Sequence, residues 1–168
     1  GHWTSYYNNP YWMRDNIRNT NRSDIFNGIL TLNYEFNKNI NINYTGNINF
    51  TQGNGVSYTN AYVDNLQVGG GDHTTVSTFD TFNQNARNYY GDLMLNFDYM
   101  LTDDINLKAN IGNNVQDAYS QFTSVGGDNL TIPGLYNISN ITGDPRRSNS
   151  FSRQRRFSFF GNLDFGLI

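Results

Sequence analysis

Apolar and polar residues alternate along several stretches of this chain. From Phe26 to Phe36 every second residue is apolar or glycine, and after a short turn the same pattern runs from Ile40 to Phe50. A two-residue period predicts β-strands, because successive side chains of a strand point to opposite faces of its sheet. The alternation predicts five strands, at about residues 24–36, 40–52, 89–101, 105–114 and 153–168.

The connections between these predicted strands are of two kinds. Short turns at 37–39 and 102–104 close two hairpins, whereas long segments at about 1–22, 53–88 and 115–152 precede or separate the hairpins and the last strand. Bacterial outer-membrane barrels likewise have short periplasmic turns and long extracellular loops. The predicted strands exceed the roughly five to six residues that are average in globular proteins. Tyr and Phe residues also lie near the strand ends, as in the aromatic girdles of such barrels.

These features together predict an all-β chain, an antiparallel transmembrane β-barrel segment with two long extracellular loops between its strands. The apolar face would contact acyl chains, and the opposite face would line a hydrated interior. Five strands cannot close a barrel, and an open sheet edge in lipid leaves backbone groups unpaired. We therefore expect the chain to be an incomplete part of a larger barrel in the bacterial outer membrane.

Composition agrees with a sheet that has one wet face. Charged residues make up 15% of the chain, aromatic residues another 15%, and Asn alone occupies 29 positions. The net charge of −3 gives no electrostatic reason to expect a nucleic-acid partner. The chain has no Cys, so disulfides and thiol chemistry are excluded.

Four stretches of the sequence point to a family. They are Asn9-Pro10-Tyr11-Trp12 with the Asn- and Arg-rich segment after it, residues 89–112 (YYGDLMLNFDYMLTDDINLKANIG), residues 130–140 (LTIPGLYNISN) and residues 151–166. In their order and spacing they are similar to the SusC/RagA-like TonB-dependent outer-membrane transporters of the Bacteroidota. This resemblance implies a parent barrel of about 22 strands that imports glycans or peptides. It also implies an internal plug, a TonB system that energises transport, and a SusD-like surface lipoprotein as partner.

Two groups of residues are candidate binding sites. Tyr11 and Trp12, in the first predicted loop together with Trp3, Tyr6 and Tyr7, have aromatic faces that suit a sugar ring or a protein partner; packing within their own loop is the alternative. Arg153 and Arg155 fall on the apolar side at the upper edge of the last strand. At that level we expect contact with the phosphates of lipopolysaccharide or other outer-membrane lipid, and salt bridges in the loop are the alternative.

The sequence offers no site for catalysis. His2 and His73 lie far apart in loop-like segments, and Asp103-Asp104 occupies a tight turn without the spacing that paired acid–base carboxylates need. We therefore expect no enzyme activity, no metal and no cofactor.

Two other functions fit the same pattern. The barrel could be a subunit or client of an outer-membrane assembly or secretion complex, without transport of its own. Alternatively, the apolar face could turn inward in a soluble β-sandwich that binds carbohydrate. Strand length and loop asymmetry speak against the sandwich.

Overall fold

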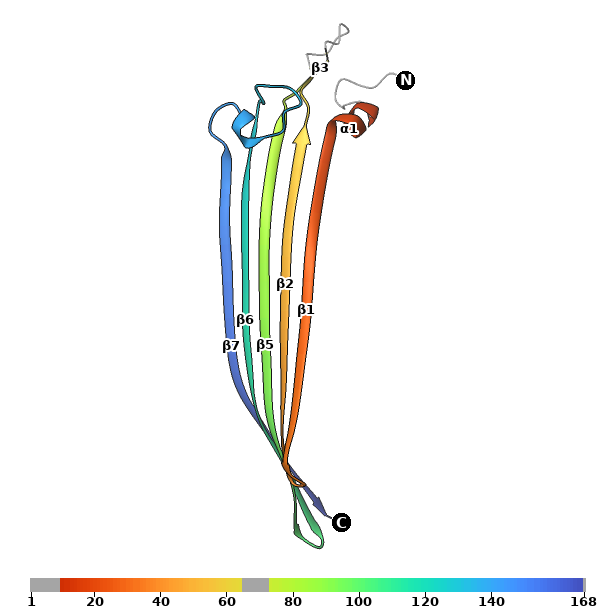
Figure 1. The fold of residues 1–168 in the computed structure, drawn as a ribbon, viewed down its shortest axis with the longest axis vertical. Helices are drawn as coiled ribbons and strands as arrows, with labels where there is room; N and C mark the ends of the chain where they lie inside the picture. Colours follow the sequence, from red (N-terminus) through yellow and green to blue (C-terminus); the bar gives the residue numbers. More distant parts are fainter. Residues whose placement is uncertain (1–9, 65–72, 168) are drawn as a thin grey trace. The chain divides into compact units, whose positions relative to one another are not determined.

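A computed structural model describes residues 10–64 and 73–167, and long strands dominate it (Figure 1). A short helix precedes them, because Pro10 has the fixed φ that suits the first turn of a helix. The long strands are β1 Ile17–Asn37, β2 Ile40–Thr59, β5 Thr78–Thr102, β6 Ile105–Asp128 and β7 Arg146–Leu167. The short elements are helix α1 Pro10–Asn16, strands β3 Tyr62–Asp64 and β4 His73–Thr75, and the 3-10 helix η1 Ile138–Asn140.

The long strands form one five-stranded antiparallel sheet in the order β1-β2-β5-β6-β7. Two-residue turns at Lys38-Asn39 and Asp103-Asp104 close its two hairpins. In the first turn the backbone N–H of Asn39 donates to Oδ1 of Asn37 at 2.8 Å. Local side-chain bonds of this kind are why Asn favours turns. The prediction of an all-β, antiparallel fold is confirmed.

The described strands are longer than the sequence predicted. They hold 20 to 25 residues each, and they include parts of the segments 1–22, 53–88 and 115–152 that were predicted as loops. The alternation of apolar and polar residues stops at the predicted ends, but a ladder of backbone hydrogen bonds needs no alternation. The alternation therefore located the sheet but underestimated the length of its strands.

The chain divides into two compact units. Unit 1 comprises residues 1–24, 52–85 and 121–150, and unit 2 comprises residues 25–51, 86–120 and 151–168. Each long strand contributes one part to each unit.

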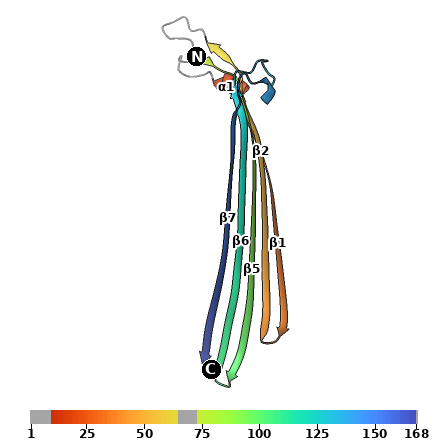
Figure 2. The ribbon, with the colours of Figure 1, turned by 90° about the vertical axis from the view of Figure 1, so that its left-hand side faces the viewer.

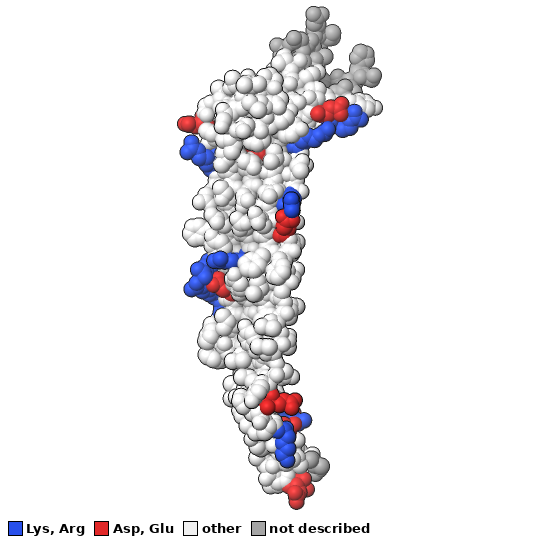
Figure 3. All heavy atoms as spheres, viewed as in Figure 1, with Lys and Arg blue, Asp and Glu red and all other residues white. Residues whose placement is uncertain are grey.

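Unit 2 is a single-layered sheet (Figure 2), and its two faces carry different side chains. Its apolar face exposes large side chains, among them Leu32 at 55%, Phe159 at 73% and Leu163 at 66%. Aromatic rings join the strands there: the ring centroids of Phe26 and Phe50 lie 6.3 Å apart, and those of Phe50 and Tyr89 lie 5.7 Å apart. Charged side chains gather in a few separate clusters with uncharged surface between them (Figure 3).

The opposite face of unit 2 is a surface of amides. Nδ2 of Asn96 on β5 donates to Oδ1 of Asn41 on β2 at 2.7 Å, and Asn49 on β2 bonds Asn27 on β1 in the same way. Side chains that face each other across neighbouring strands stabilise the pairing of those strands. These amides also remain available to water.

Unit 1 has a small core and carries the loops. Phe79 is its buried apolar side chain, at 7% exposure, and the rings of Phe82 and Phe122 stack with centroids 5.8 Å apart. Strands β3 and β4 pair antiparallel, with Val63 opposite Thr74. A sheet of two three-residue strands is too small to cover the exposed apolar face of unit 2, so the described residues do not form the predicted alternative of a β-sandwich.

No helix within residues 10–64 and 73–167 is long and apolar enough to cross a bilayer.

Candidate functional site

The loop end of unit 1 holds the first pair of predicted site residues. Helix α1 carries Tyr11 and Trp12, and its last residue, Asn16, donates from Nδ2 to the backbone oxygen of Trp12 at 3.0 Å. The Trp12 ring packs on Tyr62 of β3, with centroids 5.0 Å apart. Tyr11 is 68% exposed, and the Arg14 guanidinium lies 5.7 Å from its ring centroid. The structure therefore separates the pair: Trp12 packs on β3, and Tyr11 is exposed at the surface.

Asparagine side chains join three segments of unit 1 that are distant in sequence. The backbone N–H of Asn60, which follows β2, donates to the backbone oxygen of Asn16 at 3.0 Å, and their side-chain amides bond at 2.9 Å. The Tyr136 hydroxyl donates to Oδ1 of Asn60 at 2.6 Å. The Tyr136 ring also stacks on Tyr58 of β2, with centroids 3.7 Å apart. This network holds α1, the end of β2 and the loop at 129–145 together.

Asn140 organises the loop at 129–145. It is 5% exposed, and its side chain accepts from the backbone N–H of Ile132 at 2.9 Å. Its Nδ2 donates to the backbone oxygens of Ile132 at 2.8 Å and Leu135 at 2.7 Å. Gly134 and Gly143 adopt φ of 78° and 86°, a conformation that glycine takes without strain. The loop therefore has a defined conformation although it lacks regular structure over most of its length.

These segments of unit 1 surround a pocket of about 510 Å³. Its wall mixes amide and hydroxyl groups with small apolar surfaces. Amides both donate and accept hydrogen bonds, so the pocket suits a neutral polar ligand such as a peptide backbone or a sugar. The lining residues are Asn16, Asn60, Ala61, Ser77, Leu130, Pro133 and Gly134.

An ion-pair cluster ties three strands of unit 1 together. Arg146, the first residue of β7, lies 2.8 Å from Asp128 of β6 and 3.1 Å from Asp80 of β5. Hydrogen bonds to Asp128 and then Asp80 raise the pKa of Arg146 above its ordinary value. The cluster is about half exposed, so its main effect is to fix positions rather than to stabilise the fold.

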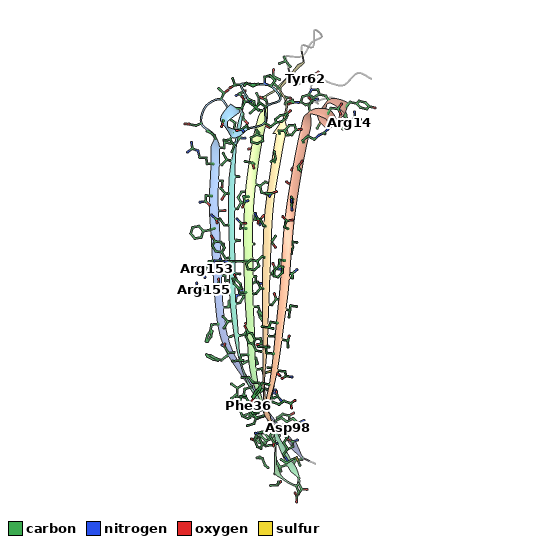
Figure 4. The ribbon with its side chains drawn as sticks, viewed as in Figure 1. Arg14, Phe36, Tyr62, Asp98, Arg153 and Arg155 are labelled. Carbon is green, nitrogen blue, oxygen red and sulfur yellow. The ribbon has the colours of Figure 1, made fainter. Side chains whose placement is uncertain are left out.

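The second pair of predicted site residues lies in unit 2. Arg153 and Arg155 lie close together along β7 (Figure 4). Arg153 donates to both carboxylate oxygens of Asp117 on β6, at 3.0 and 2.5 Å, and Nε of Arg155 donates to the same carboxylate at 3.1 Å. Both arginines thus form the salt bridges that the sequence left as an alternative. Contact with lipid head groups stays a prediction.

The other residues considered for chemistry remain isolated. Asp103-Asp104 forms a hairpin turn of unit 2. The part of the chain that the structure describes holds no group of three or more His, Asp or Glu side chains placed to bind a metal. His2, Trp3, Tyr6 and Tyr7 lie outside the described residues.

Sequence reasoning missed several of these residues. The roles of Asn60, Tyr136 and Asn140 depend on contacts that no sequence pattern shows. The chain has 29 Asn residues, and nothing in the sequence distinguishes Asn140 as a buried one. Asp117 was assigned to a loop because the alternation ended before it. The segment 130–140 was nevertheless singled out by its resemblance to a family, and it contains both Tyr136 and Asn140.

Solved structures provide a fold match. The chain superposes on the RagAB peptide importer in the 'open-open' state with a TM-score of 0.78, at 12% identity over 94% of this chain. The 'closed-closed' state of that importer gives a TM-score of 0.77 at 10% identity over 91%, and the RagAB peptide transporter gives 0.74 at 12% over 94%. The fold is that of a segment of these importer chains. The predicted fold class, a segment of an antiparallel β-barrel, is confirmed.

The match covers only a small part of each importer chain. This chain spans about 17% of the length of each of the three importer chains. No family model and no curated protein matches the sequence. At 10–12% identity the likeness shows the fold alone.

Proposed function

We propose that this chain forms five strands of a larger outer-membrane barrel, part of a SusC-like TonB-dependent transporter that imports peptides or glycans. The division of unit 2 into an exposed apolar face and an amide-rich face carries the proposal. Such a sheet is stable where one face meets acyl chains and the other meets water. The fold match to a peptide importer supports the same reading.

Charge placement on the apolar face of unit 2 agrees with contact to hydrocarbon. A Lys or Arg that faces lipid at the bilayer midplane costs about 2–4 kcal/mol. Alternate residues from Tyr89 to Leu101, from Ile105 to Val115 and from Phe157 to Leu167 carry no charge on this face. The arginines of this face lie beyond those stretches, where head groups would begin.

Substrate and partner contacts belong to the loops of unit 1 in this proposal. The pocket bordered by Asn16 and Asn60 offers amide groups to an extended peptide or a glycan. Tyr11, exposed on α1, and Trp12 beside it would contact substrate or a SusD-like surface lipoprotein that covers the loops. The TonB system would act through other parts of the transporter.

Deletion of the gene, with complementation by the intact gene, tests the proposal. Cells without the gene should lose growth on oligopeptides or on oligosaccharides as sole nutrient, and the intact gene should restore it. The protein should fractionate with the outer membrane. Recovery of the protein in the soluble fraction, or unchanged uptake of both nutrient classes, would contradict the proposal.

Tyr11→Ala in the complementing gene tests the loop contact. Because Tyr11 is exposed, its removal should reduce uptake while the amount of protein in the membrane stays the same. Tyr99→Ala, on the apolar face of β5, serves as a control for loss of an exposed ring, and it should leave uptake unchanged. Wild-type uptake by Tyr11→Ala would remove Tyr11 from the site.

A further inference from the structure

The apolar face of unit 2 is hollowed by a shallow groove of about 630 Å³. Three glycines border it, one from each of three neighbouring strands: Gly28 of β1, Gly46 of β2 and Gly91 of β5. Glycine adds no side chain to the floor of the groove, and the rings of Phe26 and Tyr44 lie beside these positions, 3.0–3.5 Å from where a Cβ would stand. Apolar side chains such as Leu30 and Ile48 line the rest of the groove. Its mainly apolar lining suits an acyl chain.

One end of this groove reaches a charged cluster on the same face. Asp117 of β6 lines the groove and binds both Arg153 and Arg155 of β7. On the other side of β6, the Arg87 guanidinium of β5 lies 4.9 Å from the ring centroid of Tyr119. We call Arg87, Arg153 and Arg155, with Asp117, the arginine cluster.

The arginine cluster has an excess of positive charge. The cluster holds three guanidiniums and one carboxylate, a net charge of about +2 because Arg stays protonated; the carboxylate pairs with Arg153 and Arg155. The side chains of Arg153 and Arg155 are 42% and 65% exposed. Each guanidinium has about five N–H donors, and the bonds to Asp117 use two from Arg153 and one from Arg155. Asp117 therefore holds two arginines side by side with donors still open to an anion.

We propose that the arginine cluster and the groove together bind lipopolysaccharide, with a phosphate of its lipid A against the guanidiniums and an acyl chain along the groove. The inference rests on the proposed function, which places this face in the outer membrane. Guanidiniums bind phosphate through paired, charge-assisted hydrogen bonds. The arginines lie on both sides of β6, a spread that suits the phosphorylated disaccharide of lipid A better than the single phosphate of a phospholipid.

Lipopolysaccharide that co-purifies with the intact protein provides the test. The double variant Arg153→Gln/Arg155→Gln removes two cations and should bind roughly ten-fold more weakly. Arg156→Gln, the next residue on β7 and on the opposite face by alternation, is the matched control and should retain wild-type lipopolysaccharide. Unchanged lipopolysaccharide in the double variant would overturn the proposal.

Asp117→Asn separates lipid binding from a purely structural salt bridge. If the arginines only neutralise Asp117, this variant and the double variant should both leave lipopolysaccharide unaffected or lower it together through loss of folding. The proposal predicts different results for the two variants. The double variant should lose lipopolysaccharide, whereas Asp117→Asn raises the positive charge of the cluster and should keep or increase the bound lipopolysaccharide. A second variant, Gly91→Leu, should reduce binding by filling the groove.

Competition and fractionation complete the design. Vesicles of phosphatidylglycerol or inorganic phosphate should not displace lipopolysaccharide from the protein, and displacement by either would overturn the choice of lipid A. All variants are also fractionated. Wild-type protein absent from the outer membrane would refute the proposed function itself, whereas membrane-located protein without an arginine effect would refute the lipid site alone.

Discussion

The ring of Phe160 lies over Gly112 in unit 2, on two strands that are neighbours in the sheet. A Cβ atom at Gly112 would lie 2.1 Å from Cζ of Phe160. Carbon atoms in contact stand about 3.5–4.0 Å apart, so the ring fills the space that a side chain at position 112 would need. An aromatic ring that covers a cross-strand glycine replaces the packing that glycine lacks.

Gly112→Val should therefore destabilise the barrel by displacing this ring. Overpacking of this kind costs about 1–3 kcal/mol, measurable as a lower free energy of unfolding of the intact protein in denaturant. Gly161→Val is the control, because a Cβ there would meet its nearest atom at 3.5 Å. In the double variant Gly112→Val/Phe160→Ala the clash should disappear, and strictly additive effects of the two substitutions would contradict the contact.

Phe160 also shows what the sequence can and cannot reveal about single residues. Alternation along β7 places it on the polar face, where an apolar ring is an exception. The reason is that its ring packs over Gly112 on the neighbouring strand. The register that brings Phe160 and Gly112 together cannot be inferred from the sequence of either strand alone. The same holds for Arg153 and Arg155, which were predicted on the apolar side without Asp117, their partner on β6.

At the scale of elements, the predicted strands all exist and their ends at the hairpin turns are right to within one residue, but their loop-side ends were wrong. The alternation that revealed β5 begins at Tyr89, whereas the strand begins at Thr78. Helix α1 was missed because seven residues carry too little periodicity to be recognised. Pattern therefore identifies an element where one of its faces is apolar. It fails where apolar residues do not alternate regularly, although backbone pairing continues the strand there.

The loop at 129–145 is an element whose conformation depends on one side chain. Asn140→Ala should leave the backbone N–H of Ile132 and the backbone oxygen of Leu135 without the partners that Asn140 provides. The Ile132 oxygen would lose one of its two hydrogen bonds and keep the one from the Leu135 N–H at 3.3 Å. The net loss of a hydrogen bond costs about 0.5–1.5 kcal/mol, so the loop should open more often. Hydrogen exchange of residues 130–142 should accelerate, while the strands stay protected.

Asn149→Ala is the matched control for this loop, because Asn149 is exposed on β7. Its exchange pattern should equal that of the wild type. Unchanged exchange at 130–142 in Asn140→Ala would show that other contacts hold the loop, and the assignment of Asn140 as its organiser would then fail.

At the scale of the whole molecule, the chain has the fold of about one sixth of an importer chain, since it covers 17% of those chains. The sequence predicted this fold class because a sheet with one apolar face imposes a two-residue period that can be recognised without a similar sequence. The predicted substrate and partner had no comparable basis, because they depend on loop residues whose contacts no periodic pattern encodes.

The central claim is that the apolar face of unit 2 touches acyl chains. This chain has no Cys, so nitroxide labels can be attached to single cysteines introduced at four successive positions of β5, namely Leu93, Met94, Leu95 and Asn96. The labels are placed in the intact protein, with any Cys outside these 168 residues replaced, and the protein is reconstituted in bilayers. The account predicts that labels at 93 and 95 are relaxed mainly by oxygen, which concentrates in hydrocarbon, and labels at 94 and 96 mainly by a water-soluble nickel complex. Preferential relaxation of 93 and 95 by the nickel complex, or no alternation at all, would contradict it.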